Sequence, residues 1–245
     1  MNIRNRAIHA EDKEERRHAI LDAAKRLLLE HPQRIVSVDE VAAQAGMAKG
    51  TVYLYFPSKE EILLGLHERH CEHFFKAMIA LLGHVKKVDI DDLVRVVQER
   101  IVDEPGYLPL AGVCFGLMEK SIPVEAQQSF KMRLAEWMME TAAGIERHFP
   151  TLGQGAGFPL LMHSYALIVG LWQLLHPTPL RDAVYDEPGL EICKLDYAAE
   201  LDRALRALWL GVLAAQPAPT KGKRPVAASK SKAPAPSKSK SGRRK

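Results

Sequence analysis

Apolar residues recur at helical spacing along nearly the whole chain between residues 16 and 215. No run of alternating apolar and polar residues is long enough to indicate a sheet, so the pattern predicts an all-α fold. The first helix is predicted from Arg16 to Glu30, and His31-Pro32 ends it because proline restricts the residue before it. Its apolar stripe consists of Ile20, Ala24, Leu27 and Leu28.

Capping residues mark the second helix. Ser37 and Glu40 form the pattern of a capping box, and Gly46 supplies the left-handed conformation that ends a helix about two turns later. The inward face of this helix is predicted to consist of Val38, Val41, Ala42 and Ala45.

A third helix, beginning at Lys49, has to be short because Pro57 follows closely. Val52 and Phe56 lie four residues apart and are predicted to face inward. The stretch Ser58-Lys59-Glu60-Glu61 reads as a second capping box, which begins a long helix through Ile62, Leu63 and Leu66. The proline therefore marks the boundary between two helices.

The segment KGTVYLYFPSKEE, residues 49–61, is unusual in its chemistry. Its glycine, threonine, tyrosines and lysines are suited to contacting a partner, and Gly50, Thr51, Tyr53 and Leu54 lie away from the inward face. A helix, a glycine-containing turn and a short second helix form a helix-turn-helix, whose second helix enters the DNA major groove. The sequence therefore predicts a three-helix DNA-binding domain.

Residues 18–70 resemble the DNA-binding region of the tetracycline-repressor-like (TetR) family of bacterial regulators. The resemblance is carried, in order and spacing, by AILDAAKRLL and SVDEVAAQAGMAKGTVYLYFPSKEEIL. It implies that DNA bases face Lys49, Gly50, Thr51 and Tyr53, and that phosphates are held by Ser37, Tyr55 and Lys59. For Tyr55 the alternative is packing against the first helix, and for Lys59 it is a plain solvated cap residue.

Two residues depart from the commoner pattern of this family. Ala48 stands where serine is frequent, which removes a helix cap and a phosphate contact. Leu54 stands where a polar or aromatic residue is frequent, which leaves only an apolar contact.

Residues 71–215 are predicted to form a helical domain that binds an effector and dimerises, as the resemblance implies. Residues 158–175 and 197–213 are strongly apolar helices, and two such helices from each subunit would make a four-helix interface. A membrane span over residues 158–175 is disfavoured because flanking Lys/Arg clusters are lacking. Candidate effector-binding residues are Cys114, Phe115, Met118, Glu119, Trp137 and His163, although such stripes are more often ordinary core.

His67, His70 and Cys71 share a helix face, which raises the alternative of a metal site. Their spacing is not H-E-x-x-H, however, and we predict neither a metal nor a cofactor, nor enzymatic activity. The cysteines, Cys71, Cys114 and Cys193, are odd in number and far apart. They fit free thiols in the cytoplasm.

Charge is distributed unevenly over the 245 residues. Residues 216–245 hold ten Lys/Arg and no acid, and their Pro, Ala and Ser content predicts a disordered basic tail. The predicted organisation is an N-terminal arm (1–17), a DNA-binding domain (18–70), an effector-binding and dimerisation domain (71–215) and the tail (216–245).

The predicted function is that of a dimeric transcription regulator, a repressor released from a palindromic operator by an unknown small molecule. The alternative is an architectural, nucleoid-type DNA-binding protein that acts through the basic tail. For the tail itself, a solubilising role is the alternative to phosphate binding.

Overall fold

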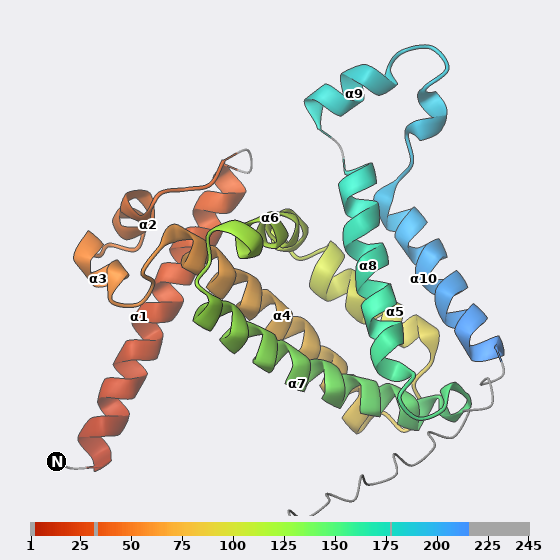
Figure 1. The fold of residues 1–245 in the computed structure, drawn as a ribbon, viewed down its shortest axis with the longest axis horizontal. Helices are drawn as coiled ribbons and strands as arrows, with labels where there is room; N and C mark the ends of the chain where they lie inside the picture. The colour runs from red at the N-terminus through yellow and green to blue at the C-terminus, as the bar shows by residue number, and fades with distance from the viewer. Residues whose placement is uncertain (1–2, 32–33, 177, 216–245) are drawn as a thin grey trace, which may run out of the picture.

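The computed structural model describes residues 3–31, 34–176 and 178–215; the predicted basic tail lies outside the described residues. Every element within these ranges is helical, in agreement with the predicted all-α fold. The chain begins with α1 (Ile3–Glu30), α2 (Val38–Gln44) and α3 (Lys49–Tyr53), followed by the long helix α4 (Lys59–His84). These four helices form the N-terminal unit (Figure 1).

The first helix starts well before the predicted Arg16, so the predicted arm over residues 1–17 is largely helical. No proline or glycine interrupts this stretch. Glu14 lies 3.7 Å from Arg17 and 3.2 Å from His18, pairs that add small increments to an exposed helix. The apolar stripe alone could not predict this extension, because residues 12–16, which precede the stripe, are all polar and exposed.

The N-terminal unit has its own hydrophobic core. Ile20 and Leu21 of α1 and Val52 of α3 are fully buried, and Phe56 is nearly so. A Cβ added to Gly65 of α4 would lie 2.8 Å from the Phe56 ring, closer than real Cβ contacts allow. The glycine therefore lets the end of the α3 segment dock directly on α4.

Helix α4 continues beyond this unit into a second core. It packs beside α7 (Val124–His148) and contacts α5 (Ile90–Val97) and α6 (Tyr107–Lys120). A π-helical turn, Gln98–Val102, extends α5, and Figure 1 shows α4 and α7 lying side by side. The same helix thus belongs to both domains.

Helices α8 (Gly157–Leu175) and α10 (Tyr197–Ala214) lie side by side and close the larger domain. A short 3-10 turn, Pro150–Leu152, precedes α8. The segment that connects α8 to α10 contains α9 (Pro179–Tyr185) and a second 3-10 turn (Glu191–Cys193). The Trp209 indole donates to Ser164 Oγ at 3.1 Å, and Tyr197 Oη donates to the Ile168 carbonyl at 3.1 Å. These bonds fix the pairing of the two helices.

Helix α8 is, within the described residues, long and apolar enough to cross a membrane by length and composition alone. Only 28% of its most apolar window is buried inside the chain, so much of one face is open. On α10 the residues Leu201, Leu205 and Trp209 are buried in the core of the chain itself. A subunit interface on α10 therefore has to use its other face.

Candidate DNA-binding surface and effector cavity

The capping box at the start of α2 is complete. Ser37 Oγ accepts from the Glu40 backbone N–H at 3.3 Å, and the Glu40 carboxylate accepts from the Ser37 backbone N–H at 2.9 Å. Arg34 makes two bonds to the same carboxylate, at 2.6 and 3.0 Å, which together with the Ser37 bonds lower the pKa of Glu40 to about 2. Gly46 has φ +66°, the left-handed conformation predicted to end this helix.

Helix α3 presents an exposed outer face above two buried anchors. Val52 and Phe56 point into the core as predicted, whereas Tyr53 is 43% and Leu54 80% exposed. Ala48 is the N-cap and provides no side-chain hydrogen bond, which confirms the expected loss of the side-chain cap. A Cβ added to Gly50 would meet nothing within 4 Å, so packing within the chain does not require a glycine there.

Several of the predicted DNA-contacting residues meet at one place. Ser37, Lys49, Tyr53 and Lys59 line a single surface hollow between the starts of α2 and α4 and helix α3. Thr51 is half-buried on α3, and Tyr55 is half-buried against the N-terminal core. The second capping pattern is half formed, because Ser58 Oγ accepts from the Glu61 backbone N–H at 3.1 Å without a reciprocal bond.

Lys49 has an acidic partner on this surface. Its Nζ lies 2.8 Å from Asp39 Oδ1, and the hydrogen bond to Asp39 raises the pKa of Lys49. The same ammonium lies 5.9 Å from the centroid of the Tyr53 ring. Both groups of the ion pair are about half exposed, so the pair is weak and Lys49 can exchange Asp39 for another anion.

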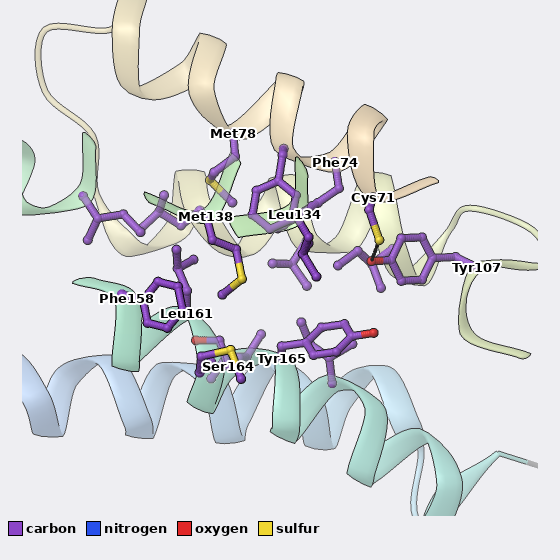
Figure 2. A pocket seen from close by; sticks show the side chains of 18 of the residues that line it. Cys71, Phe74, Met78, Tyr107, Leu134, Met138, Phe158, Leu161, Ser164 and Tyr165 are labelled. Atoms are coloured by element: carbon purple, nitrogen blue, oxygen red, sulfur yellow. Dashed lines mark hydrogen bonds between the residues drawn. The ribbon is translucent and has the colours of Figure 1, made fainter. Parts of the chain in front are cut away.

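A cavity of about 300 Å³ lies inside the larger domain, between α4, α5, α7, α8 and α10. Figure 2 shows side chains from these helices converging on it, with Met78, Phe158 and Leu161 toward one end and Cys71 and Tyr107 at the other. Its walls are predominantly apolar, which is the usual composition of a small-molecule site. Further lining residues are Phe74, Phe75, Leu93, Val97, Ile101, Phe130, Leu134, Met138, Ile168 and Trp209.

The polar groups at the Tyr107 end are uncharged near neutral pH. Burial lowers the pKa of His67 to about 3 and raises that of Cys71 to about 12, while the pKa of Tyr107 is raised by burial. Cys71 Sγ lies 3.7 Å from His67 Nε2 and 3.8 Å from Tyr107 Oη. These are weak sulfur contacts, so the Tyr107 hydroxyl retains capacity for a stronger partner.

Three of the predicted effector residues, Cys114, Trp137 and His163, lie away from this cavity. Cys114 is buried in the N-terminal core, 3.8 Å from the Leu63 carbonyl, and does not line the cavity. Trp137 stacks on Phe75 at 6.2 Å outside the lining, and His163 is exposed on α8. The side chains of Phe115, Met118 and Glu119 lie outside the part of the structure that is described.

The candidates Trp137 and His163 belong to the lining helices α7 and α8, but their side chains do not line this cavity. On α8 the cavity is lined by Leu161, Ser164, Tyr165 and Ile168, the turn-to-turn neighbours of one stripe, while His163 falls on the opposite side. On α4, the residues that line the cavity begin with His67 and Cys71, the two residues for which a metal site was the alternative. Among the described residues, no cluster of His, Cys, Asp or Glu could hold a metal ion.

The two cores meet around Glu104. Its carboxylate forms an ion pair with Lys25 of α1 and lies 3.7 Å from His70 Nε2 of α4. This second contact is not an ion pair at neutral pH, because burial, with nearby Lys25 and Arg69, lowers the pKa of His70 to about 3. A further ion pair, at 2.7 Å, joins Arg69 to Asp22 of α1.

These features define a helix-turn-helix DNA-binding protein with a ligand cavity in a second helical domain. Comparison with known families agrees: residues 20–66 match "Bacterial regulatory proteins, tetR family", and residues 68–216 match "Tetracyclin repressor-like, C-terminal domain". The chain belongs to the TetR family of bacterial transcriptional regulators. It is therefore a regulator by family and not an enzyme.

Several known proteins are similar to parts of the chain. The regulator EthR of Mycobacterium tuberculosis is 30% identical over 133 residues, which cover 54% of this chain and 61% of EthR. The fatty acid metabolism regulator protein of Bacillus subtilis is 41% identical over 59 residues, 24% of this chain and 30% of that protein. The latter match is too short to bear on the ligand.

One solved structure supports the fold independently. A TetR-family protein from Mesorhizobium loti superposes with a TM-score of 0.51 at 18% identity. The match covers 82% of this chain and 96% of that protein. At this identity the similarity concerns the fold alone.

Proposed function

We propose that the protein is a homodimeric repressor that binds a palindromic operator and is released from it by a small molecule. The observation that carries this proposal is the continuity of α4, which begins at Lys59 on the candidate DNA surface and lines the cavity with Cys71, Phe74 and Met78. A ligand that moves this helix within the larger domain also moves the DNA-binding unit. Because operators are read inside the cell, we place the protein in the cytoplasm.

For the DNA contacts, we assign base readout to Lys49, Gly50, Thr51 and Tyr53, and phosphate contacts to Ser37, Tyr55 and Lys59. The exposure of Tyr53 and the open space at Gly50 support this assignment. Lys49 exchanges Asp39 for a base or phosphate on binding, since its present ion pair is solvent-exposed.

For the dimer, the outer faces of α8 and α10 offer a suitable surface. Leu174 is 67% and Leu210 58% exposed, and a Cβ at Gly170 or Gly211 would meet no atom of the described residues within 4 Å. Small residues on adjoining helices allow close approach of two further helices, as in a four-helix bundle. A two-fold interface there places two recognition helices on successive major grooves.

In this proposal, the protein is released from its operator by a shift between two conformations of the dimer. A ligand lowers operator affinity only to the extent that it binds better to the conformation whose α3 helices no longer match the grooves. The cavity borders α4 on one side and α8 and α10 on the other, so its filling changes how these helices pack.

The test is selection of bound sequences from random duplex DNA with the full chain, followed by competition with small molecules. We expect an inverted repeat and loss of binding in the presence of a cavity ligand. Binding that shows no sequence preference would contradict the proposal and favour the architectural alternative. Family membership gives that alternative no support, and the tail on which it depends lies outside the described residues.

A further inference from the structure

The cavity is polarised along its length. His67, Cys71 and Tyr107 gather at one end, whereas Met78, Phe158 and Leu161 lie toward the opposite end (Figure 2). The hydroxyl of Ser164, beside Leu161, is already bonded to the Leu160 carbonyl and the Trp209 indole. A ligand that fills both ends needs an apolar body and a polar terminus. The polar end determines which terminus fits.

Lys131 is the charged residue in the lining, and no acidic residue accompanies it there. The side chain is exposed, and its Nζ lies 5.9 Å from the centroid of the buried Phe130 ring, which also lines the cavity. Nearby Arg133 is paired with Glu68, but Lys131 has no ion-pair partner among the residues that the structure describes. An unpaired cation therefore stands at the rim of an apolar cavity.

The charge of Lys131 acts on the polar end of the cavity. It contributes to lowering the pKa of His67 and opposes the rise in the pKa of Cys71, although burial dominates both shifts. Lys131 is therefore close enough to His67 and Cys71 for its field to reach them. His67, Cys71 and Tyr107 are all uncharged near neutral pH, and Glu68, whose charge also reaches Cys71, is already paired with Arg133.

We infer that the effector is an amphipathic monocarboxylic acid, with its carboxylate between Lys131 and the Tyr107 hydroxyl and its apolar body directed toward Met78 and Phe158. This inference rests on the proposed function, because it names the ligand class of the same cavity. A carboxylate at the exposed Lys131 keeps part of its hydration, which avoids the cost of burying an unpaired charge. The volume, about 300 Å³, suits a small ligand.

The test compares two probes that differ only in the terminal group, decanoic acid and decan-1-ol, by calorimetric titration of the full chain without DNA. At neutral pH the acid is ionised. We expect it to bind at least about tenfold more tightly than the alcohol, which corresponds to about 1.4 kcal/mol.

Variants of the protein then show where the terminal group of the ligand binds. Lys131→Met keeps the length of the side chain and removes its charge, so it should weaken decanoate binding about tenfold and leave decanol binding unchanged. Tyr107→Phe should weaken decanoate binding several-fold through loss of the hydroxyl alone. Lys76→Met is the matched control, because Lys76 pairs with Glu72 on α4 and does not line the cavity.

Equal affinity for the two probes, or decanoate binding unaffected by Lys131→Met, would overturn the inference. If neither probe binds while another compound releases the protein from its operator, the ligand class is wrong and the proposed function stands. If the selected DNA shows no sequence preference, the proposed function fails regardless of how the two probes bind.

Discussion

The phenol ring of Tyr107 stacks on the imidazole of His70, with ring centroids 5.7 Å apart and planes inclined by 14°. Tyr107 lines the cavity, and His70 lies 3.7 Å from the Glu104 carboxylate, which pairs with Lys25 of α1. A continuous set of contacts thus joins the polar end of the cavity to the first helix of the DNA-binding unit. For the proposed ligand, these contacts offer a second route, besides α4 itself, by which its binding would shift the candidate DNA-binding surface.

The first prediction concerns this junction. Glu104→Gln removes the ion pair with Lys25, a partly exposed pair whose loss costs little stability. The ratio of operator affinities without and with ligand gives the coupling free energy between the two sites. We expect this coupling free energy to decrease by about 0.5 to 2 kcal/mol. The ratio is measured by fluorescence anisotropy of labelled operator. Asp186→Asn, which removes an exposed ion pair with Lys194 near α9, is the control, and an unchanged ratio for Glu104→Gln would rule this route out.

The second prediction concerns stability in acid. Burial lowers the pKa of His67 and His70 to about 3, below the value of about 6.5 in an unfolded chain. Above the unfolded value both states are uncharged. Below it the unfolded chain binds protons that the folded chain does not, so each histidine reduces the free energy of unfolding by about 1.4 kcal/mol per pH unit.

Urea denaturation at about pH 7.5 and about pH 5 measures this effect, and each histidine should account for about 2 kcal/mol of the loss. His67→Gln should shrink the loss by that amount even if the variant is less stable at both pH values. His18→Gln, at a half-exposed surface position, is the control. A pH dependence identical to that of the parent would show that His67 is not the buried neutral group described above.

The third prediction uses the open space at Gly50. Alanine there meets nothing in the free protein and favours the helix by about 0.5 to 1 kcal/mol, so the Tm should hold or rise slightly. Operator affinity should nevertheless fall, because the added methyl group occupies space needed for close approach to the duplex. Thermal melting and operator titration on the same sample separate the two effects. Unchanged operator affinity would remove Gly50 from the docking face.

The fourth prediction compares Tyr53 and Lys59, two exposed residues of the candidate DNA surface. Tyr53→Ala should cost about 1 to 3 kcal/mol in operator binding and relax sequence preference, because we assign this side chain to base contacts. Lys59→Ala should weaken operator and scrambled duplex to a similar extent and make binding less salt-dependent, as expected for a phosphate contact. Mobility-shift titrations over a salt series test both. A Tyr53→Ala variant with parental affinity and preference would show that α3 docks through another face.

The fifth prediction tests the dimer without disturbing the core. Gly170→Arg and Gly211→Arg place bulky charges on the open faces of α8 and α10, where no atom of the described residues lies within 4 Å of the new Cβ. We expect helical, soluble monomers by light scattering and circular dichroism. Gly116→Arg on α6 is the matched control, since its Cβ also meets nothing. Leu205→Glu would be less informative, because Leu205 is buried in the protomer and its loss would unfold the chain.

Local signals in the sequence were sufficient for much of the N-terminal unit, although not for the start of α1 or for the reciprocal bond of the second capping box. The Ser37 capping box, the left-handed Gly46 and the inward Val52 and Phe56 all follow from residue chemistry within a few positions, and the structure confirms them. The same holds for the extents of the two apolar C-terminal helices. Such features depend on neighbours along the chain, which a sequence displays directly.

The cavity could not be located in this way, because its walls depend on how distant helices rotate against one another. Ser164 and His163 are adjacent in sequence, yet Ser164 bonds to Trp209 inside the domain and His163 faces solvent. Cys114 lies on the apolar helix α6, but that part of α6 packs on Leu63 of the N-terminal unit. The apolar pattern predicts that such residues are buried, but it does not determine which of the two hydrophobic cores they pack in.

The three cysteines differ in accessibility in a way that bears on how the protein can be studied. Cys71 and Cys114 are buried, and burial raises the pKa of each thiol to about 12, so both resist alkylation in the folded state. Cys193 is partly exposed in the 3-10 turn between α9 and α10. The native chain thus carries its own attachment point for a maleimide fluorophore or spin label. Distances between two such labels would report the dimer and its response to ligand without any engineered cysteine.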